Sequence, residues 1–289
     1  MESELSPVLP DLPGQFPAVE LLVLAATGVA LVGCLWVAMV LLRRLQRGEA
    51  PVPLRPHEPV LWGANDVATV LFLWLAAQLV AVAVVPGATP PQTATLSARL
   101  AASVVASLLG TLFACWHLLS RGASRESLGF GLATFAADAR LAVATLALVT
   151  GPLLIVAGLL DRLVPYKHPV IDLLASQRNG YSLWLVVLSA VVVAPIAEEF
   201  LFRRVLQGWL EKRLPEADGM WAIAISSLVF GLAHFGQGLG WLPLVVLGAV
   251  LGYLARQTGS IVPGILLHAL FNSVSVVLLL AQLAGVPAG

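Results

Sequence analysis

The sequence predicts an all-α protein, a polytopic transmembrane helix bundle of about eight spanning helices. Of the 289 residues, 59% are hydrophobic and only 11% are charged, whereas a soluble domain carries about 25% charged residues. The apolar residues also gather in long runs, and an α-helix needs about 20 such residues to cross a bilayer. Because the formal net charge is zero, nothing indicates a nucleic-acid partner, and the lipid bilayer is the expected environment.

Each apolar run defines one candidate spanning helix, and charged or turn-rich segments separate the runs. The predicted spans cover residues 18–42, 67–85, 100–119, 141–160, 181–210, 220–235, 241–255 and 261–283. Segment 128–137 has a mixed composition and is expected to lie along the membrane interface. Residues 1–17 carry acidic side chains and four prolines, so they are expected to form a flexible acidic tail.

We expect two regions after this tail: an N-terminal transmembrane region of about four helices, residues 18–180, and a catalytic core, residues 181–283. If the N-terminus lies outside, twelve of the sixteen Lys and Arg residues fall on the inner side, as the positive-inside rule favours. The expected protein is therefore a multi-pass protein of the cell membrane (inner or plasma membrane). In this orientation the region of Glu198 lies at the cytoplasmic end of its helix.

The most informative cluster is Glu198, Glu199 and Arg203, because ionisable side chains are costly in a bilayer and usually mark function. On a helix, Glu199 and Arg203 are four residues apart and can form an ion pair. Glu198 points about 100° away and can face a cavity, where a carboxylate can serve as general base. The alternative is a helix end with ordinary flanking charges. It is less favoured, because carboxylates reach water from such positions less easily than Lys or Arg.

Two further clusters lie on later predicted helices. His234 follows Phe230 by four residues, and His268 precedes Asn272 by four, so His268 and Asn272 share one helix face. Taken singly, His234 is better explained as a structural residue, and the His268–Asn272 pair could serve only in packing between helices. Two carboxylates, two histidines and an amide on three of the last four predicted helices together indicate a site that activates water.

The residues alone leave two kinds of site open. His234, His268 and Glu198 could supply three ligands to zinc and leave an open position for water. In the metal-free alternative, a glutamate is the base and the His268–Asn272 pair donates to the oxyanion. The soluble zinc-protease motif His-Glu-x-x-His is absent from the sequence, and spacing does not choose between the two.

The three clusters resemble a known pattern. Glu198-Glu199-Phe-Leu-Phe-Arg203, Phe230-Gly-Leu-Ala-His234 and His268-Ala-Leu-Phe-Asn272 are similar to the three motifs of the CPBP intramembrane proteases. This family includes CAAX prenyl proteases and bacteriocin-processing proteins, and it is also called the Abi family. The resemblance covers roughly residues 181–280.

The resemblance implies an intramembrane endopeptidase that acts on a membrane-anchored protein or peptide. In such an enzyme Glu198 would activate the attacking water, and Glu199 and Arg203 would orient the site. His234 would hold the water or a metal, and zinc is the cofactor that the metal alternative implies. His268 and Asn272 would stabilise the oxyanion or complete the site.

Two other classes of protein are weighed against the protease. A non-catalytic membrane scaffold or bacteriocin self-immunity protein could have the same fold. A proton-coupled transporter is a further alternative, because buried carboxylates and histidines also form proton relays. The middles of the first four predicted helices are nearly free of charge, which counts against the transporter.

Overall fold

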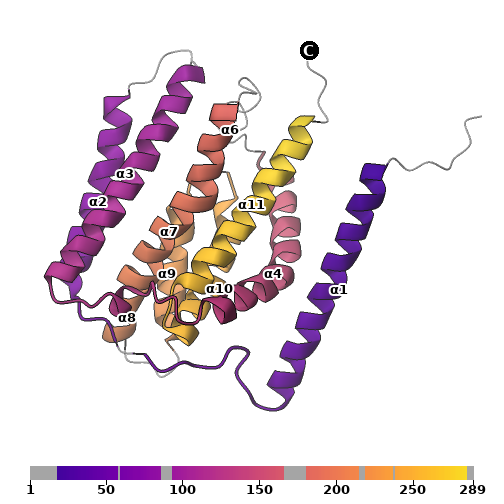
Figure 1. Cartoon of the computed structure of the whole chain (residues 1–289), viewed down its shortest axis with the longest axis horizontal. Coiled ribbons are helices and arrows are strands. Elements are labelled where there is room, and N and C mark those ends of the chain that lie inside the picture. Colours follow the sequence, from indigo (N-terminus) through magenta and orange to yellow (C-terminus); the bar gives the residue numbers. More distant parts are fainter. Residues whose placement is uncertain are drawn as a thin grey trace, which may run out of the picture.

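The computed structural model describes residues 18–57, 59–85, 93–165, 180–214, 219–236 and 238–284. Every regular element in these ranges is a helix and none is a strand, so the predicted all-α bundle is confirmed (Figure 1). The expected acidic tail, residues 1–17, lies outside the described ranges.

The helices follow the predicted runs closely. The first half of the chain forms α1 (Ala18–Gln46), α2 (Ala64–Val84), α3 (Thr93–Ser120), the 3₁₀ turn η1 (Glu126–Leu128) and α4 (Phe135–Leu163). The second half forms α6 (Gly180–Val187), η2 (Leu188–Val193), α7 (Ala194–Glu198), η3 (Glu199–Gln207), α8 (Gly208–Arg213), α9 (Met220–Leu232), α10 (Trp241–Thr258) and α11 (Val262–Ala284). The segments α6 to α8 follow one another directly and form one continuous rod.

Six helical stretches of the described chain are long and apolar enough to cross a membrane. With α1 and the shorter apolar α9, they agree with the prediction of about eight helices. However, α9 has only 13 residues and is about 20 Å long at 1.5 Å per residue. It is too short to cross a hydrocarbon core of about 30 Å, so the predicted span 220–235 is only partly helical.

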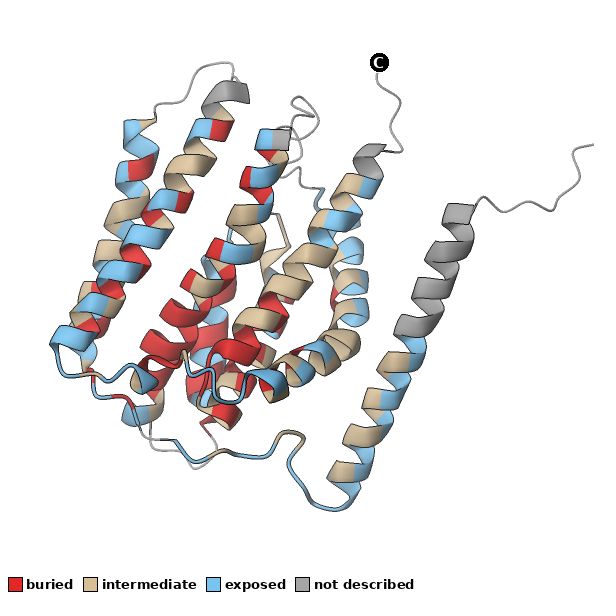
Figure 2. Ribbon diagram, viewed as in Figure 1, coloured by how far each residue is buried: buried red, intermediate tan, exposed pale blue. Residues whose placement is uncertain are grey.

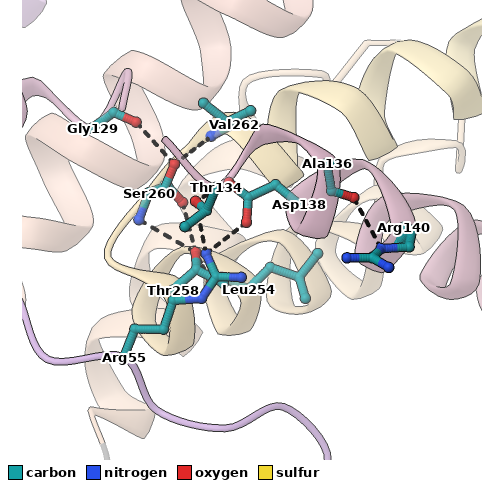
Figure 3. Close-up of polar contacts among 10 residues, drawn as sticks. All are labelled: Arg55, Gly129, Thr134, Ala136, Asp138, Arg140, Leu254, Thr258, Ser260 and Val262. Atoms are coloured by element: carbon teal, nitrogen blue, oxygen red, sulfur yellow. Dashed lines mark hydrogen bonds and ion pairs between the residues drawn. The ribbon is translucent and has the colours of Figure 1, made fainter. Parts of the chain in front are cut away.

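The start of α4 also differs from the prediction. The helix begins at Phe135, six residues before the predicted start, so the last three residues of segment 128–137 belong to α4. The interfacial position of the rest of the segment stays a prediction. Asp138 in its first turn is fully buried. It accepts hydrogen bonds from Thr134 (2.8 Å) and from Arg55 of the segment between α1 and α2 (2.6 Å), as Figure 3 shows. These partners compensate the carboxylate, which allows a charged residue inside an apolar helix.

The helices are arranged around the continuous rod. In Figure 1, α2 and α3 pair on one side of it, α11 crosses the centre, and α4 and α1 lie on the other side. The rod contacts α3 on one flank and α11 on the other, and α9 packs against η3 and α10. The rod is therefore placed where helices from both halves of the chain meet.

The exposed and buried residues are distributed differently from those of a soluble protein. Large apolar side chains such as Leu109, Leu112 and Trp116 of α3 are exposed, as expected of a surface that faces lipid. The buried residues gather in the lower half of the bundle (Figure 2). All nine residues of η3 are buried, and three of them are charged: Glu199, Arg203 and Arg204. Polar groups enclosed in this way need partners within the protein.

Candidate active site

The rod changes its helical form on both sides of the glutamate pair, because η2 and η3 are π-helices. Such segments are rare in proteins overall, and those that occur are often found at functional sites. In η2, the Ala194 N–H donates to the Ser189 carbonyl, five residues back. In this register the N–H of residue 195 would donate a hydrogen bond to the Ala190 carbonyl. Residue 195 is proline, however, which has no N–H. Asn272 of α11 donates to that carbonyl instead, at 2.7 Å, so the amide ties α11 to the rod where the proline leaves an acceptor.

Glu199 and Arg203 form an ion pair, as the spacing predicted. The Arg203 Nε lies 3.3 Å from the Glu199 Oε2, and both side chains have 0% exposure. Such a pair is stable only when further contacts offset the loss of hydration. Arg203 has two: its guanidinium lies 4.6 Å from the centre of the Phe230 ring, and its Nη1 donates to the Ser226 hydroxyl at 3.3 Å. This pair fixes the position of Glu199.

His268 lies between the two carboxylates. Its Nδ1 is 3.3 Å from the Glu199 Oε1, and its Nε2 is 3.8 Å from the Glu198 Oε2. The second distance suits an ion pair but exceeds a hydrogen bond, so Glu198 keeps its oxygens available for another partner. The Glu198 side chain is 18% exposed, whereas that of Glu199 is sealed. The two glutamates thus have the different environments that their angular separation predicted.

His234 lies in the turn that follows α9, two residues beyond the end of that helix. Its Nδ1 is 2.9 Å from the Phe230 carbonyl. Because a carbonyl can only accept, the Nδ1 carries the proton, and the Nε2 of the neutral ring is left as an acceptor. The Phe230 ring packs edge-on against both histidine rings, with centroids 5.1 Å from His234 and 5.8 Å from His268. Phe230 therefore sets the positions of both imidazoles.

A partly open cavity of about 780 Å³ brings the candidate residues together. Glu198, His234, His268 and Asn272 all line it. The cavity follows α11 from His268 to Leu279, a distance of about 16 Å at 1.5 Å per residue. Glu198 lies near the middle of the continuous rod rather than at its end. The cytoplasmic orientation of the site stays a prediction.

Helices α2 and α3 form the facing wall of this cavity, and the sequence analysis assigned them no role. Gln78, Ser103 and Ser107 line the cavity and bond to one another. Gln78 donates from its Nε2 to the Ser107 hydroxyl at 2.8 Å, and Ser103 donates to the Gln78 Oε1 at 3.0 Å. The sequence signal was the pair of serines four residues apart in an apolar helix, which places both on one face.

The described residues do not fit the zinc alternative as they are placed. Zinc needs three convergent protein donors, and within the described ranges no group of three or more His, Cys, Asp or Glu side chains could hold a metal ion. The His234 Nδ1 bonds to a carbonyl, and the nitrogens of His268 face the two glutamates. Zinc binding stays a prediction from the sequence.

These observations define a class of protein: a polytopic membrane helix bundle whose buried carboxylate and imidazole groups open on a cavity. Residues 180–274 match the model of the Rce1-like family, described as type II CAAX prenyl endopeptidase Rce1-like. The resemblance to the CPBP and CAAX protease family is therefore confirmed for this segment, which contains all six candidate site residues. The family implies protease activity. No curated protein and no solved structure matches the chain.

Proposed function

We propose that this protein is an intramembrane endopeptidase that uses Glu198 as general base to hydrolyse a peptide bond of a membrane-associated protein or peptide. The proposal rests on the different environments of the two glutamates. Glu199 is fully buried and forms an ion pair with Arg203, whereas Glu198 lines a cavity beside His234 and His268. The family match supports the class of reaction, and the roles of the residues are our inference.

In the first step, Glu198 takes a proton from a water molecule, and the water oxygen bonds to the carbonyl carbon of the scissile peptide. The carbonyl becomes a tetrahedral oxyanion. In the second step the C–N bond breaks, and Glu198 returns the proton to the leaving amine, which yields a new carboxyl group and a new amino group. A positioned carboxylate that shuttles a proton in this way typically contributes about 10²–10⁴-fold to the rate.

The other residues receive roles from their hydrogen bonds. In the neutral form of His234 the Nε2 is an acceptor, and in that form it suits the second proton of the attacking water and helps to orient it. Asn272 uses one amide N–H on the Ala190 carbonyl, and its second N–H is the donor that we assign to the oxyanion. His268, Glu199 and Arg203 hold Glu198 and the helices around it in place.

The cavity walls suggest how a substrate is held. The cavity is long and mostly apolar, and it carries one polar strip made of Gln78, Ser103 and Ser107 opposite the catalytic side. An extended peptide segment has unpaired backbone N–H and C=O groups that need partners in an apolar setting. We infer that this strip binds the substrate backbone.

Replacing Gln78 with leucine should therefore weaken substrate binding more than it slows the chemistry. We expect Gln78→Leu to raise KM for a membrane-anchored peptide by about tenfold while kcat changes little, because a hydrogen bond lost equally from ground and transition states affects KM. Steady-state cleavage in proteoliposomes measures both constants. Leu79→Ala, at an exposed neighbouring position on α2, is the control. A fall in kcat at constant KM would contradict a binding role.

A second prediction concerns Gly264 of α11. A Cβ at this position would lie 2.9 Å from the Glu199 Oε2, so Gly264→Ala should displace that carboxylate from Arg203 and His268. A misplacement of about 1 Å in a catalytic group can cost about 10²-fold, and we expect a loss of that order in kcat. Gly158→Ala on α4, where a Cβ meets nothing within 4 Å, should retain the full rate. Equal rates for the two variants would show that the Glu199 position is not critical.

The experiment that tests the proposed function is a cleavage assay with metal analysis on the same preparation. Purified protein in proteoliposomes is given a set of membrane-anchored reporter peptides with and without a chelator, and its zinc content is measured. We expect cleavage that survives the chelator and zinc well below one atom per chain. Near-stoichiometric zinc that is lost in His234→Ala and His268→Ala, together with activity lost in chelator, would replace this mechanism with a metal-dependent one. Failure to cleave any peptide would favour the non-catalytic scaffold.

A further inference from the structure

A second cavity, separate from the catalytic one, lies at the end of the bundle where the segment between α1 and α2 passes beneath α8. Its volume is about 290 Å³. Among the described residues, the ionisable side chains that line it are four Arg or Lys residues, one histidine and one carboxylate: Arg55, Arg204, Lys212, Arg256, His57 and Glu211. Nothing in the proposed hydrolysis uses these residues.

The charges in and around this cavity do not cancel. Arg256 pairs with Glu211 at 3.4 Å, and Arg55 pairs with Asp138 at 2.6 Å. The other two cations donate to neutral carbonyl groups instead. Arg204 donates to the Ser127 carbonyl, and Lys212 donates to the Leu61 and Trp62 carbonyls at 2.9 and 3.3 Å. Among the described residues, four Arg or Lys side chains against two carboxylates leave a surplus of two positive charges, which favours an anionic occupant.

The shape of the cavity is fixed by the fold, because the segment between α1 and α2, which forms one of its walls, is hydrogen-bonded to the helices. The Arg55 N–H donates to the Gln257 carbonyl at 2.7 Å, and the Trp62 indole donates to the Val205 carbonyl at 3.1 Å. Gly208 of α8 lies so close to Val60 that a Cβ there would be 2.7 Å from a Val60 methyl group. The basic groups are therefore held in a defined arrangement around the cavity.

The surroundings of the cavity favour a lipid over a free anion. Leu54 lines the cavity and is 62% exposed, and Leu61, whose carbonyl binds Lys212, is 60% exposed. These two side chains place apolar surface beside the charged groups, as an acyl chain attached to a headgroup requires. The distribution of Lys and Arg also predicts that this end of the bundle is cytoplasmic, where basic pockets among transmembrane helices bind anionic headgroups.

We propose that this cavity binds the phosphate headgroup of an anionic phospholipid, with Lys212 and Arg204 contacting the phosphate and Leu54 and Leu61 flanking the acyl chains. Lipid binding at this site depends on the fold but not on the proposed hydrolysis, so it can be confirmed or refuted whether or not the protein is a protease.

The test measures lipid binding to the whole protein in detergent by native mass spectrometry, with phosphatidylglycerol as probe and phosphatidylcholine as reference. We expect preferential retention of phosphatidylglycerol. A cationic side chain near a headgroup is worth about fivefold in affinity, so Lys212→Gln should lose about that much and Lys212→Glu should lose more. Arg213→Gln and Arg213→Glu are the matched controls, because Arg213 is the exposed neighbour that does not line the cavity.

Three results would overturn the proposal. Equal losses at Arg213 and Lys212 would mean general attraction to a charged surface rather than a site. Equal retention of the two lipids would remove the selectivity. A rise in thermal stability with inorganic phosphate, without retention of phosphatidylglycerol, would assign the cavity to a free anion. The melting temperature of each variant, measured in the same detergent, shows whether the fold is intact.

Discussion

Glu198→Gln is expected to abolish hydrolysis while the protein remains folded. The amide has nearly the shape of the carboxylate but cannot take a proton from water, so the loss should be about 10²–10⁴-fold in kcat. Stability should change little, because the Glu198 side chain is 18% exposed and its ion-pair contact with His268 spans 3.8 Å. Cleavage of a reporter peptide and the melting temperature of the same sample measure the two effects.

The control for Glu198 is Glu126→Gln in η1, which makes the same chemical change at an exposed site far along the chain. It should cleave at the wild-type rate. If Glu198→Gln cleaved at the wild-type rate as well, Glu198 would not be the base, and the site would need another source of activated water.

Arg203→Met is expected to give the largest loss of stability. It removes the arginine that is paired with Glu199 and leaves a carboxylate with 0% exposure in the protein interior, in contact with His268 alone among its described ionisable neighbours. Breaking a buried ion pair on one side costs about 3–5 kcal/mol. We expect a clear fall in the melting temperature in detergent and loss of cleavage with it.

The double variant Glu199→Gln with Arg203→Met separates stability from chemistry. Without the buried negative charge, most of the lost stability should return, because replacing both members of a buried pair is far less costly than removing one. Cleavage should not return, since Glu199 also holds His268 at 3.3 Å. A melting temperature that is equally low in the single and double variants would show that the charge is not the cause.

The fold was largely predictable because the bilayer imposes a simple length rule. Apolar runs of about 20 residues located nearly every helix. The rule failed where polar residues are satisfied inside the protein. Asp138 interrupts the apolar run that predicted α4 from residue 141, but Arg55, distant in the chain, compensates its charge, and α4 therefore begins earlier than predicted. In α9 the apolar run continues past the helix, which ends at Leu232, so composition overestimated its length.

The site was predictable wherever its geometry is local. The Glu199–Arg203 pair and the shared face of His268 and Asn272 follow from a spacing of four residues. The Asn272 contact with the Ala190 carbonyl depends on a π-helical register and on a neighbouring helix. A spacing of four residues in the sequence indicates neither of these. The wall of Gln78, Ser103 and Ser107 depends on how the two halves of the chain pack. Long-range packing of this kind is not encoded in local spacing.

The central claim, that this cavity hydrolyses peptide bonds with Glu198 as base, is tested most directly by following the oxygen of water into the product. Purified wild-type and Glu198→Gln proteins are incubated with membrane-anchored peptides in water labelled with heavy oxygen, and the products are read by mass spectrometry. We expect new carboxyl termini that carry the heavy oxygen with the wild-type protein and none above background with the variant. The same labelled termini from both proteins, or no labelled termini from either, would contradict it.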